Sequence, residues 1–169
     1  MGATMNLVFD IETTGFDFDS LAESQQEFLL RYAEHEKDIS KKEEMMDDAK
    51  RFLSLYPLTA KVIAIGMLNT QTEKEMILYE GESDQDVIIE EKNIKYKPMT
   101  DFEMLKHFWQ YALKAEKVIT FNGRNFDIPF LMIRSAMLKV KPTKNFMKYR
   151  YDSKEHVDLL EQFTFYGST

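Results

Sequence analysis

Two apolar segments of this chain lead to carboxylates, and this feature constrains the fold most. From Met5 to Glu12, apolar residues alternate with other residues, a period that is typical of a half-buried strand. Asp10 and Glu12 are two positions apart, so both carboxylates lie on one face of that strand. A second apolar segment, Lys117–Phe121, leads to Asp127 at the start of a predicted helix. Acids that converge from such elements form an oxygen-ligand site suited to Mg²⁺ or Mn²⁺.

The hydropathy pattern also predicts an α/β order of elements. Residues 61–68 and 75–80 are expected to form two more strands, which continue the first as an antiparallel meander. Thr100 and Glu103 match a capping box, so a helix is predicted from Thr100 to Glu116. The next helix is predicted from Asp127 to about Val140. Elements in this order favour an α/β fold with one mixed sheet.

A charged block at about residues 17–56 interrupts the order of strands. Its apolar residues keep helical spacing, so we expect two amphipathic helices inserted into a single domain of residues 1–169. Ser40 and Glu43 match a second capping box, which would start the second of these helices. The simplest interpretation of the mixed charges is a solvated helix face.

Composition limits the classes of function. The chain has 169 residues, a net charge of −7 and no cysteine, which excludes disulfides, thiolate metal sites and thiol nucleophiles. No apolar run is long enough to cross a bilayer, and no signal-peptide pattern opens the sequence, so we expect a cytoplasmic protein without a membrane partner. An acidic protein binds polyanions poorly unless its cations are gathered locally.

One stretch of the chain does concentrate positive charge. Between residues 139 and 150 it carries five cations and no acid: Lys139, Lys141, Lys144, Lys148 and Arg150. Three aromatic residues, Phe146, Tyr149 and Tyr151, lie among or beside them. Such a stretch is typical of a surface that follows a single nucleic-acid strand by charge and stacking. It is equally typical of a solvated loop whose aromatic side chains turn inward.

The two carboxylate motifs resemble those of the DEDD superfamily of 3′-5′ exonucleases, in particular the proofreading exonucleases of family-B DNA polymerases and their stand-alone relatives. Phe9-Asp10-Ile11-Glu12-Thr13-Thr14-Gly15 matches the first motif of that family. Asn122-Gly123-Arg124-Asn125-Phe126-Asp127, followed by Ile128-Pro129-Phe130-Leu131, matches the second. The resemblance implies a ribonuclease H-like fold, with a mixed central sheet flanked by helices. It also implies a 3′-5′ exonuclease that hydrolyses single-stranded DNA, with RNA as the alternative substrate.

The same resemblance implies roles for individual residues. Asp10, Glu12 and Asp127 would be the catalytic acids and would hold two divalent cations, Mg²⁺ or Mn²⁺. The residues that would bind the 3′ end of the substrate are Thr13, Thr14, Gly15, Phe16, Asn122 and Phe126, with Phe16 as a wedge against the terminal bases. The N-terminus of the predicted helix should favour the anionic form of Asp127. We interpret Asp158 as a structural residue, with catalysis as its alternative role.

The last motif of the family has no counterpart in this sequence. That motif is Tyr-x-x-x-Asp or His-x-x-x-x-Asp, and it supplies a fourth acid and a residue that positions water. Tyr149 and Asp152 are one residue too close for it, and His156 and Asp158 are closer still. We therefore expect a ribonuclease H-like domain that lacks its C-terminal helices and has impaired activity.

Other interpretations fit the same residues. Asp10 and Glu12 are compatible with ordinary charges at a strand end, and Asp127 with a plain helix cap. The chain as a whole is also compatible with a non-catalytic nucleic-acid-binding or interaction module of the same fold. A third candidate is another ribonuclease H-like nuclease that cuts internally. The two complete motifs, in the right order, favour the exonuclease, and the oligomeric state is not predicted.

Overall fold

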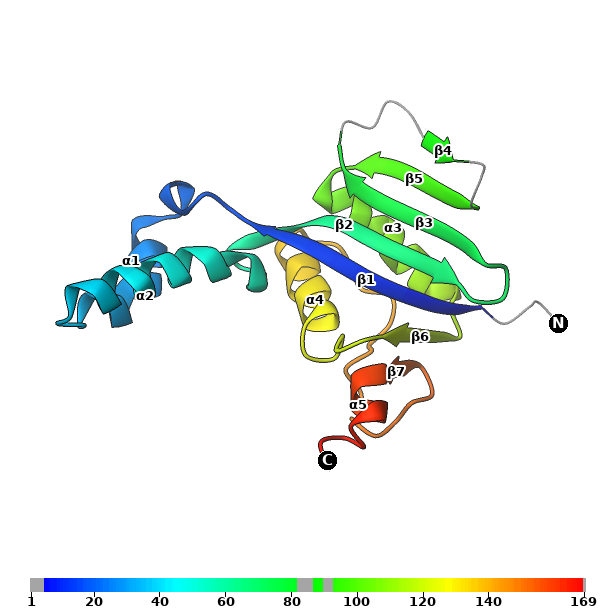
Figure 1. Ribbon diagram of the computed structural model, residues 1–169. Coiled ribbons are helices and arrows are strands. Elements are labelled where there is room, and N and C mark those ends of the chain that lie inside the picture. The colour runs from blue at the N-terminus through cyan, green and yellow to red at the C-terminus, as the bar shows by residue number, and fades with distance from the viewer. Residues whose placement is uncertain (1–4, 82–86, 90–92, 169) are drawn as a thin grey trace. The chain divides into compact units, whose positions relative to one another are not determined.

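The computed structural model describes residues 5–81, 87–89 and 93–168. The chain divides into two compact units (Figure 1). The first, which we call the sheet unit, comprises Met1–Glu12 and Val62–Thr169, and the second, the helical unit, is Thr13–Lys61. Within the described residues, no helix has both the length and the apolar character needed to span a membrane.

The sheet unit is built on a mixed sheet, whose described strands follow the order β4-β5-β3-β2-β1-β6-β7. The strands are β1 (Asn6–Gly15), β2 (Ala60–Asn69), β3 (Lys74–Glu80), β4 (Val87–Ile89), β5 (Ile94–Met99), β6 (Lys117–Thr120) and β7 (His156–Asp158). β1 and β2 run in opposite directions (Figure 1), and β2 pairs antiparallel with β3. β6 pairs parallel with both β1 and β7. The predicted meander and the mixed sheet of a ribonuclease H-like fold are therefore confirmed.

Three helices belong to the described part of the sheet unit: α3 (Asp101–Lys114), α4 (Asp127–Met137) and α5 (Leu159–Phe163). The capping box of α3 is confirmed, because the Glu103 carboxylate accepts hydrogen bonds from the N–H and the hydroxyl of Thr100, both at 2.9 Å. α4 begins at Asp127 as predicted but ends before Val140. It stops early because Lys139 takes a left-handed φ of 57°, which an α-helix does not allow.

The core of this unit lies between the sheet and its two longer helices. The ring of Phe9 on β1 packs edge-on against Phe108 of α3, with centroids 4.8 Å apart. Phe108 packs in the same way on Trp109 at 5.0 Å. The indole N–H of Trp109 donates to the hydroxyl of Ser135 on α4 at 2.8 Å. These contacts place α3 and α4 on one face of the sheet, and α3 lies behind the strands in Figure 1.

A buried ion pair holds α4 against the start of α3. Arg134 Nε lies 2.7 Å from Asp101 Oδ2, and the two side chains are only 10% and 11% exposed. The other oxygen of Asp101 accepts the backbone N–H of Val62 on β2 at 3.3 Å. One carboxylate therefore links two helices and a strand, which fixes the position of α4 in the unit.

The helical unit contains α1 (Glu23–Glu34) and α2 (Ile39–Arg51), with short 3₁₀ turns η1 (Phe18–Ser20) and η2 (Phe52–Leu55). These are the two helices expected between the first two strands. The predicted cap at Ser40 is wrong, because α2 already begins at Ile39. Asp38 caps it instead, since its carboxylate accepts the backbone N–H of Lys41 at 3.2 Å.

Candidate functional site

β1 presents its two acids on the face opposite to the helix-covered core. Phe9 and Ile11 are 2% and 5% exposed, whereas Asp10 and Glu12 are exposed. The alternation predicted from the sequence is confirmed, and it follows from the two-residue period of a strand.

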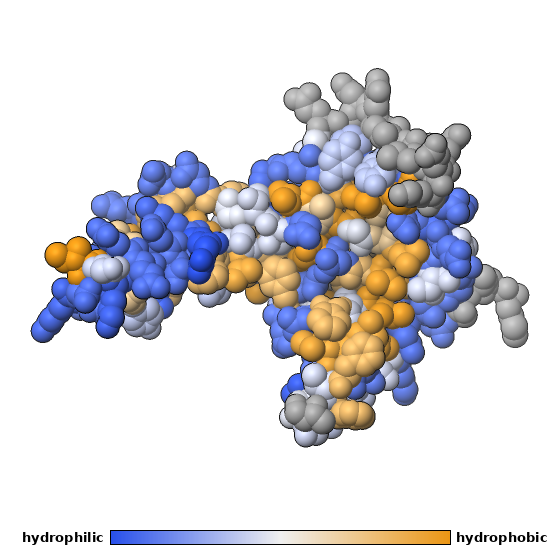
Figure 2. All heavy atoms as spheres, in the orientation of Figure 1, coloured by the Kyte–Doolittle hydropathy of each residue, from blue (hydrophilic) through white to orange (hydrophobic). Residues whose placement is uncertain are grey.

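A hollow of about 250 Å³ lies beside Asp10 on this open face of the sheet. Its apolar lining includes Val8 on β1, Leu68 on β2 and Ile77 on β3. Apolar residues are visible over these strands in Figure 2. Asp10 therefore stands at the border between a polar strand end and an apolar concave surface.

Asp127 reaches the same strand from α4. β6 ends at Thr120 while β1 continues, so the backbone of β1 beyond Val8 has no β6 partner in the ladder. Asp127 Oδ1 accepts the backbone N–H of Ile11 at 3.2 Å and so takes the place of a strand partner. Its side chain is buried, with the residue only 3% exposed. The structure thus brings Asp127 to β1 next to Asp10.

Burial and Asp10 set the charge state of Asp127. Desolvation, and after it the negative charge of Asp10, raise the pKa of Asp127 to about 6. Hydrogen bonds from the backbone N–H groups of Asp127 and Ile11 lower this pKa but are outweighed. The helix N-terminus was expected to favour the anionic form of Asp127, but burial and the charge of Asp10 outweigh it, and the pKa rises.

Asp10 and Asp127 fit a divalent cation as oxygen ligands. A bound cation would offset the repulsion between the two carboxylates, and Mg²⁺ and Mn²⁺ prefer such hard ligands. Glu12 shares the face of β1 with Asp10 but is not gathered with the pair. In the part of the chain that the structure describes, no group of three His, Cys, Asp or Glu side chains is placed to hold a metal.

Asp158 holds the loop that precedes Asp127. Its Oδ1 accepts the backbone N–H groups of Asn122 at 2.9 Å and Leu160 at 3.0 Å, and its Oδ2 accepts that of Arg124 at 2.9 Å. The residue is 3% exposed. Asp158 therefore has a structural role, because backbone N–H groups donate to both of its carboxylate oxygens.

The loop from Asn122 to Phe126 is tightly constrained. Asn122 has a left-handed φ of 61°, and its side-chain oxygen accepts Asn125 Nδ2 at 2.9 Å. A Cβ on Gly123 would lie 2.4 Å from Thr120 Oγ1, so only glycine fits there without displacing its neighbours. Phe126 is half-buried, with its ring centroid 5.7 Å from that of Phe130.

No role was predicted for Glu161, whose buried carboxylate pairs with two arginines in the structure. Its carboxylate lies 3.3 Å from Arg124 Nε and 2.6 Å from Arg150 Nε, and its side chain is 7% exposed. The sequence offered only one weak signal, an acid within the short C-terminal helix. Arg124 is distant in sequence from Arg150 and Glu161, so this cluster depends on the tertiary fold.

The remaining predicted substrate residues belong to the helical unit: Thr13, Thr14, Gly15 and Phe16. A Cβ on Gly15 would lie 2.7 Å from Leu53 Cβ, so this glycine is required by packing within the helical unit. The backbone N–H of Phe16 donates to the carbonyl of Thr59 at 2.8 Å. Thr13 and Thr14 are half-buried. Their proposed contacts with a 3′ end remain predictions from the sequence.

The chain is similar to proteins of a known family. A family model described as a predicted 3′-5′ exonuclease related to the exonuclease domain of PolB matches residues 51–169. The family-B DNA polymerase of the hyperthermophilic archaeon Pyrobaculum calidifontis is structurally similar with a TM-score of 0.49 and 14% identity. The similarity covers 95% of this chain and 16% of the polymerase chain. No curated protein matches the sequence. Since the family model spans most of the chain, including the loop and helix that deliver Asp127, the chain belongs to this family of predicted PolB-related 3′-5′ exonucleases.

Proposed function

We propose that the chain is a metal-dependent exonuclease that removes nucleotides from the 3′ end of single-stranded DNA. The observation that carries the proposal is the Asp10–Asp127 pair, in which a buried carboxylate with a raised pKa lies beside a second carboxylate. The pair stands where β6 ends beside the parallel strand β1, and ligand sites of α/β sheets gather at such strand ends. Membership of an exonuclease family favours phosphodiester chemistry at this pair.

In this proposal Asp10 and Asp127 would hold Mg²⁺ or Mn²⁺, and Glu12 would have to turn toward the pair to supply a further ligand for a second cation. When bound, such cations lower the pKa of water and withdraw charge from the scissile phosphate. The oxygen of water bonds to the terminal phosphorus, and the bond from that phosphorus to the 3′ oxygen of the preceding nucleotide breaks. The products are a nucleoside 5′-monophosphate and a strand shortened by one nucleotide. Solvent takes the proton that water loses and returns one to the 3′ oxygen.

We assign the terminal nucleotide to the loop before α4. Phe126 keeps part of its ring exposed while its contact with Phe130 fixes its position, so a base or sugar can pack on it. Asn122 is fixed by Asp158 through its backbone N–H. Thr13, Thr14, Gly15 and Phe16 follow Glu12 in the chain, and their assignment to the same strand end rests on the resemblance of the first motif.

Turnover by this chain should be slow. No tyrosine or histidine with an aspartate at the family's spacing follows Asp127 in these 169 residues. The second candidate is a non-catalytic module that binds nucleic acid. It is favoured by one observation, the lack of a three-ligand metal group among the described residues.

The test uses 5′-labelled single-stranded DNA with excess protein and Mn²⁺. We expect a ladder that shortens from the 3′ end, is lost in Asp10→Ala and is kept in the matched control Glu44→Ala, an exposed acid on α2. Internal fragments from the first time point would instead indicate an endonuclease. Binding without cleavage by the wild-type chain would indicate the non-catalytic module. An oligoribonucleotide of the same sequence would determine the preference between DNA and RNA.

A further inference from the structure

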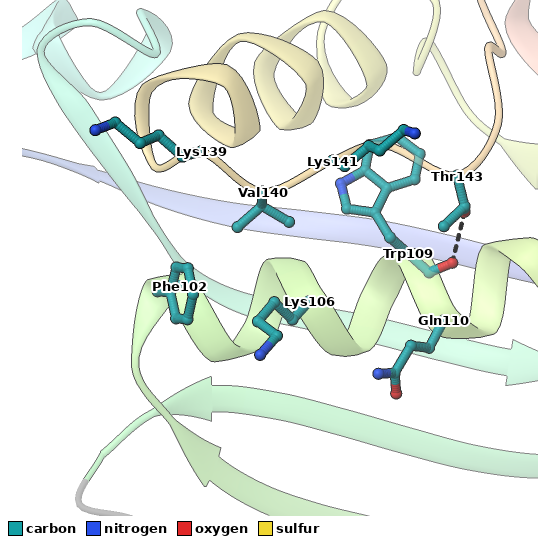
Figure 3. A pocket seen from close by; sticks show the side chains of 8 residues that line it. All are labelled: Phe102, Lys106, Trp109, Gln110, Lys139, Val140, Lys141 and Thr143. Atoms are coloured by element: carbon teal, nitrogen blue, oxygen red, sulfur yellow. Dashed lines mark hydrogen bonds between the residues drawn. The ribbon is translucent and has the colours of Figure 1, made fainter.

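A pocket of about 270 Å³ lies at the far end of α4 from Asp127 (Figure 3). One side is α3, which contributes Phe102, Lys106 and Trp109, and the other is the segment after α4 with Lys139, Val140 and Lys141. The lining carries three lysines and no acid, although the chain as a whole has a net charge of −7. Positive charge is thus concentrated locally in an acidic protein.

The cations of the basic stretch fall into two groups in the structure: those that pair with other groups of the chain, and those that line the pocket. Lys148 forms an ion pair with Glu155 at 2.8 Å, Arg150 forms one with Glu161, and Lys144 donates to the carbonyl of Ala115. Phe146 turns inward and is 2% exposed, whereas Tyr149 and Tyr151 stay exposed, at 72% and 54%. The cations of this half of the stretch are therefore engaged by other groups of the chain itself.

Lys139 and Lys141 are the two cations of the stretch that line the pocket, and Lys106 of α3 lines it with them. In the part of the chain that the structure describes, none of the three forms an ion pair within 4.0 Å. The nearby carboxylate of Glu103 is occupied by the N–H and the hydroxyl of Thr100. Lys106 Nζ lies over the ring of Phe102, 5.3 Å from its centroid, and a neutral ring leaves its positive charge in place. None of the three charges is therefore neutralised by a carboxylate within 4.0 Å in the described residues, and all three are available to a ligand with several negative charges.

The three ammonium groups do not converge on one point. In Figure 3, Lys139 and Lys141 extend in opposite directions along the pocket, and Lys106 extends from the facing helix. A single small anion would need converging donors. Charges spread along a groove suit an extended polyanion, whose phosphates recur at intervals.

The floor of the pocket is apolar and firmly held. Val140 is 7% exposed, and its backbone N–H donates to the carbonyl of Ser135 at 2.8 Å. Thr143 Oγ1 donates to the carbonyl of Trp109 at 2.7 Å, which ties the segment to α3 (Figure 3). Phe102 is 43% exposed, with the Lys106 ammonium over its ring, so it offers a base an aromatic surface next to a positive charge. The pocket therefore needs little rearrangement to accept a strand.

We infer that this pocket is a second contact for the single-stranded substrate, and that it holds phosphates on the 5′ side of the terminal nucleotide. The inference rests on the proposed exonuclease function. α4 has 11 residues and so spans roughly 16 Å at 1.5 Å per residue. A strand with its 3′ end at the Asp10–Asp127 pair would need to extend past the terminal nucleotide to reach the lysines, so short substrates would miss them.

The test compares Lys106→Gln/Lys139→Gln/Lys141→Gln with a matched triple variant, Lys37→Gln/Lys74→Gln/Lys154→Gln. The control changes the net charge equally at exposed lysines outside the pocket. Fluorescence anisotropy measures binding of a long labelled oligothymidylate in Ca²⁺ over a range of salt concentrations. The pocket variant should bind about a hundredfold more weakly at 0.1 M salt, with a salt slope reduced by about 2, because each single-strand phosphate contact contributes about 0.7. The control variant should match the wild type, and circular dichroism checks that both fold.

Binding is read without cleavage, so this test succeeds or fails independently of the catalytic proposal. If cleavage is present, the pocket variant should also lose its preference for long strands and cleave a dinucleotide at the wild-type rate. Equal affinity of the pocket and control variants for DNA would overturn the inference. Failure of the wild type to bind DNA, with lysine-dependent binding of a labelled polyglutamate peptide, would overturn it too and assign the pocket to an acidic protein partner.

Discussion

The two ends of α4 carry charges of opposite sign and hold them differently. At the N-terminal end Asp127 is buried beside Asp10, and burial raises its pKa to about 6. Beyond the C-terminal end Lys139 and Lys141 are exposed and spread along a groove. The first arrangement makes two like charges interact strongly over a short distance. The second keeps like charges apart in water, where each acts almost independently.

This difference indicates two kinds of ligand. A compact pair of carboxylates in a partly desolvated site suits one small ion of high charge density. Dispersed lysines over an apolar floor are matched by a long chain with repeated charges. Since one helix connects the two sites, changes that loosen α4 should affect both, whereas changes at one end should leave the other intact.

The largest effect is expected from Arg134→Met, which breaks the anchor that both ends share. The substitution leaves Asp101 buried without its partner, and such losses cost about 3–5 kcal/mol. The control is Arg51→Met, which breaks the Asp48 pair on α2 at a side chain that is 69% exposed and should cost no more than about 1 kcal/mol. Urea unfolding measures both, and equal losses would show that the Asp101–Arg134 pair does not hold α4.

Asp127→Asn should affect the N-terminal end alone. Asparagine keeps the size of the side chain and an oxygen for the N–H of Ile11, but it removes the negative charge. Mn²⁺ affinity should fall at least about a hundredfold, the upper range for supporting residues of metal sites, while oligonucleotide affinity in Ca²⁺-free buffer is kept. Isothermal titration calorimetry measures the first and anisotropy the second. Asp47→Asn, at an exposed acid of α2, is the matched control, and equal Mn²⁺ affinity in both variants would refute the assignment.

Cation binding should also depend on pH in a range that reflects Asp127. Because protons compete for a carboxylate whose pKa is raised to about 6, Mn²⁺ should bind about tenfold more weakly at pH 5 than at pH 7. A carboxylate with an ordinary pKa would give almost no change over that interval. The affinity must fall as the pH falls, since protonation of Asp127 removes a cation ligand. A flat profile, or tighter binding at pH 5, would contradict the account.

The smallest effect is expected at the other end, from Thr143→Val. This change removes the hydroxyl that donates to the carbonyl of Trp109 and should lower the free energy of unfolding by about 1 kcal/mol. It should weaken oligonucleotide binding a few-fold, because the Lys139–Lys141 segment is less firmly held, and it should leave Mn²⁺ affinity unchanged. A matched fall in Mn²⁺ affinity would show that the two ends of α4 are not independent.

Local patterns in the sequence predicted those parts of the fold that depend on neighbouring residues. The alternation of β1 and the capping box of α3 are of this kind, because a two-residue period and a three-residue spacing determine them. The cap of α2 was misplaced because Ser40 and Asp38 are both good capping residues and the sequence does not say which one comes first. The early end of α4 depends on the backbone conformation of Lys139, which no composition rule requires.

The sequence indicated candidate residues for the site, but neither their grouping nor their energetics. The acidic motifs indicated Asp10 and Asp127, yet the raised pKa of Asp127 depends on burial that only the fold reveals. The lysine pocket could not be foreseen, because Lys106 is distant in sequence from Lys139 and joins it only when α3 packs beside α4. Within the basic stretch, the fold also determines which cations find acids, and this again is a property of tertiary structure.

The measurement that tests the central claim most directly is the identity of the product. Wild-type protein in excess is incubated with single-stranded DNA and Mn²⁺, and the products are identified by mass spectrometry, with Asp127→Asn in parallel. We predict nucleoside 5′-monophosphates released from the 3′ end by the wild type and none from the variant. An intact strand with the wild type, or the same products from both proteins, would contradict the assignment of the Asp10–Asp127 pair as the centre of a 3′-5′ exonuclease.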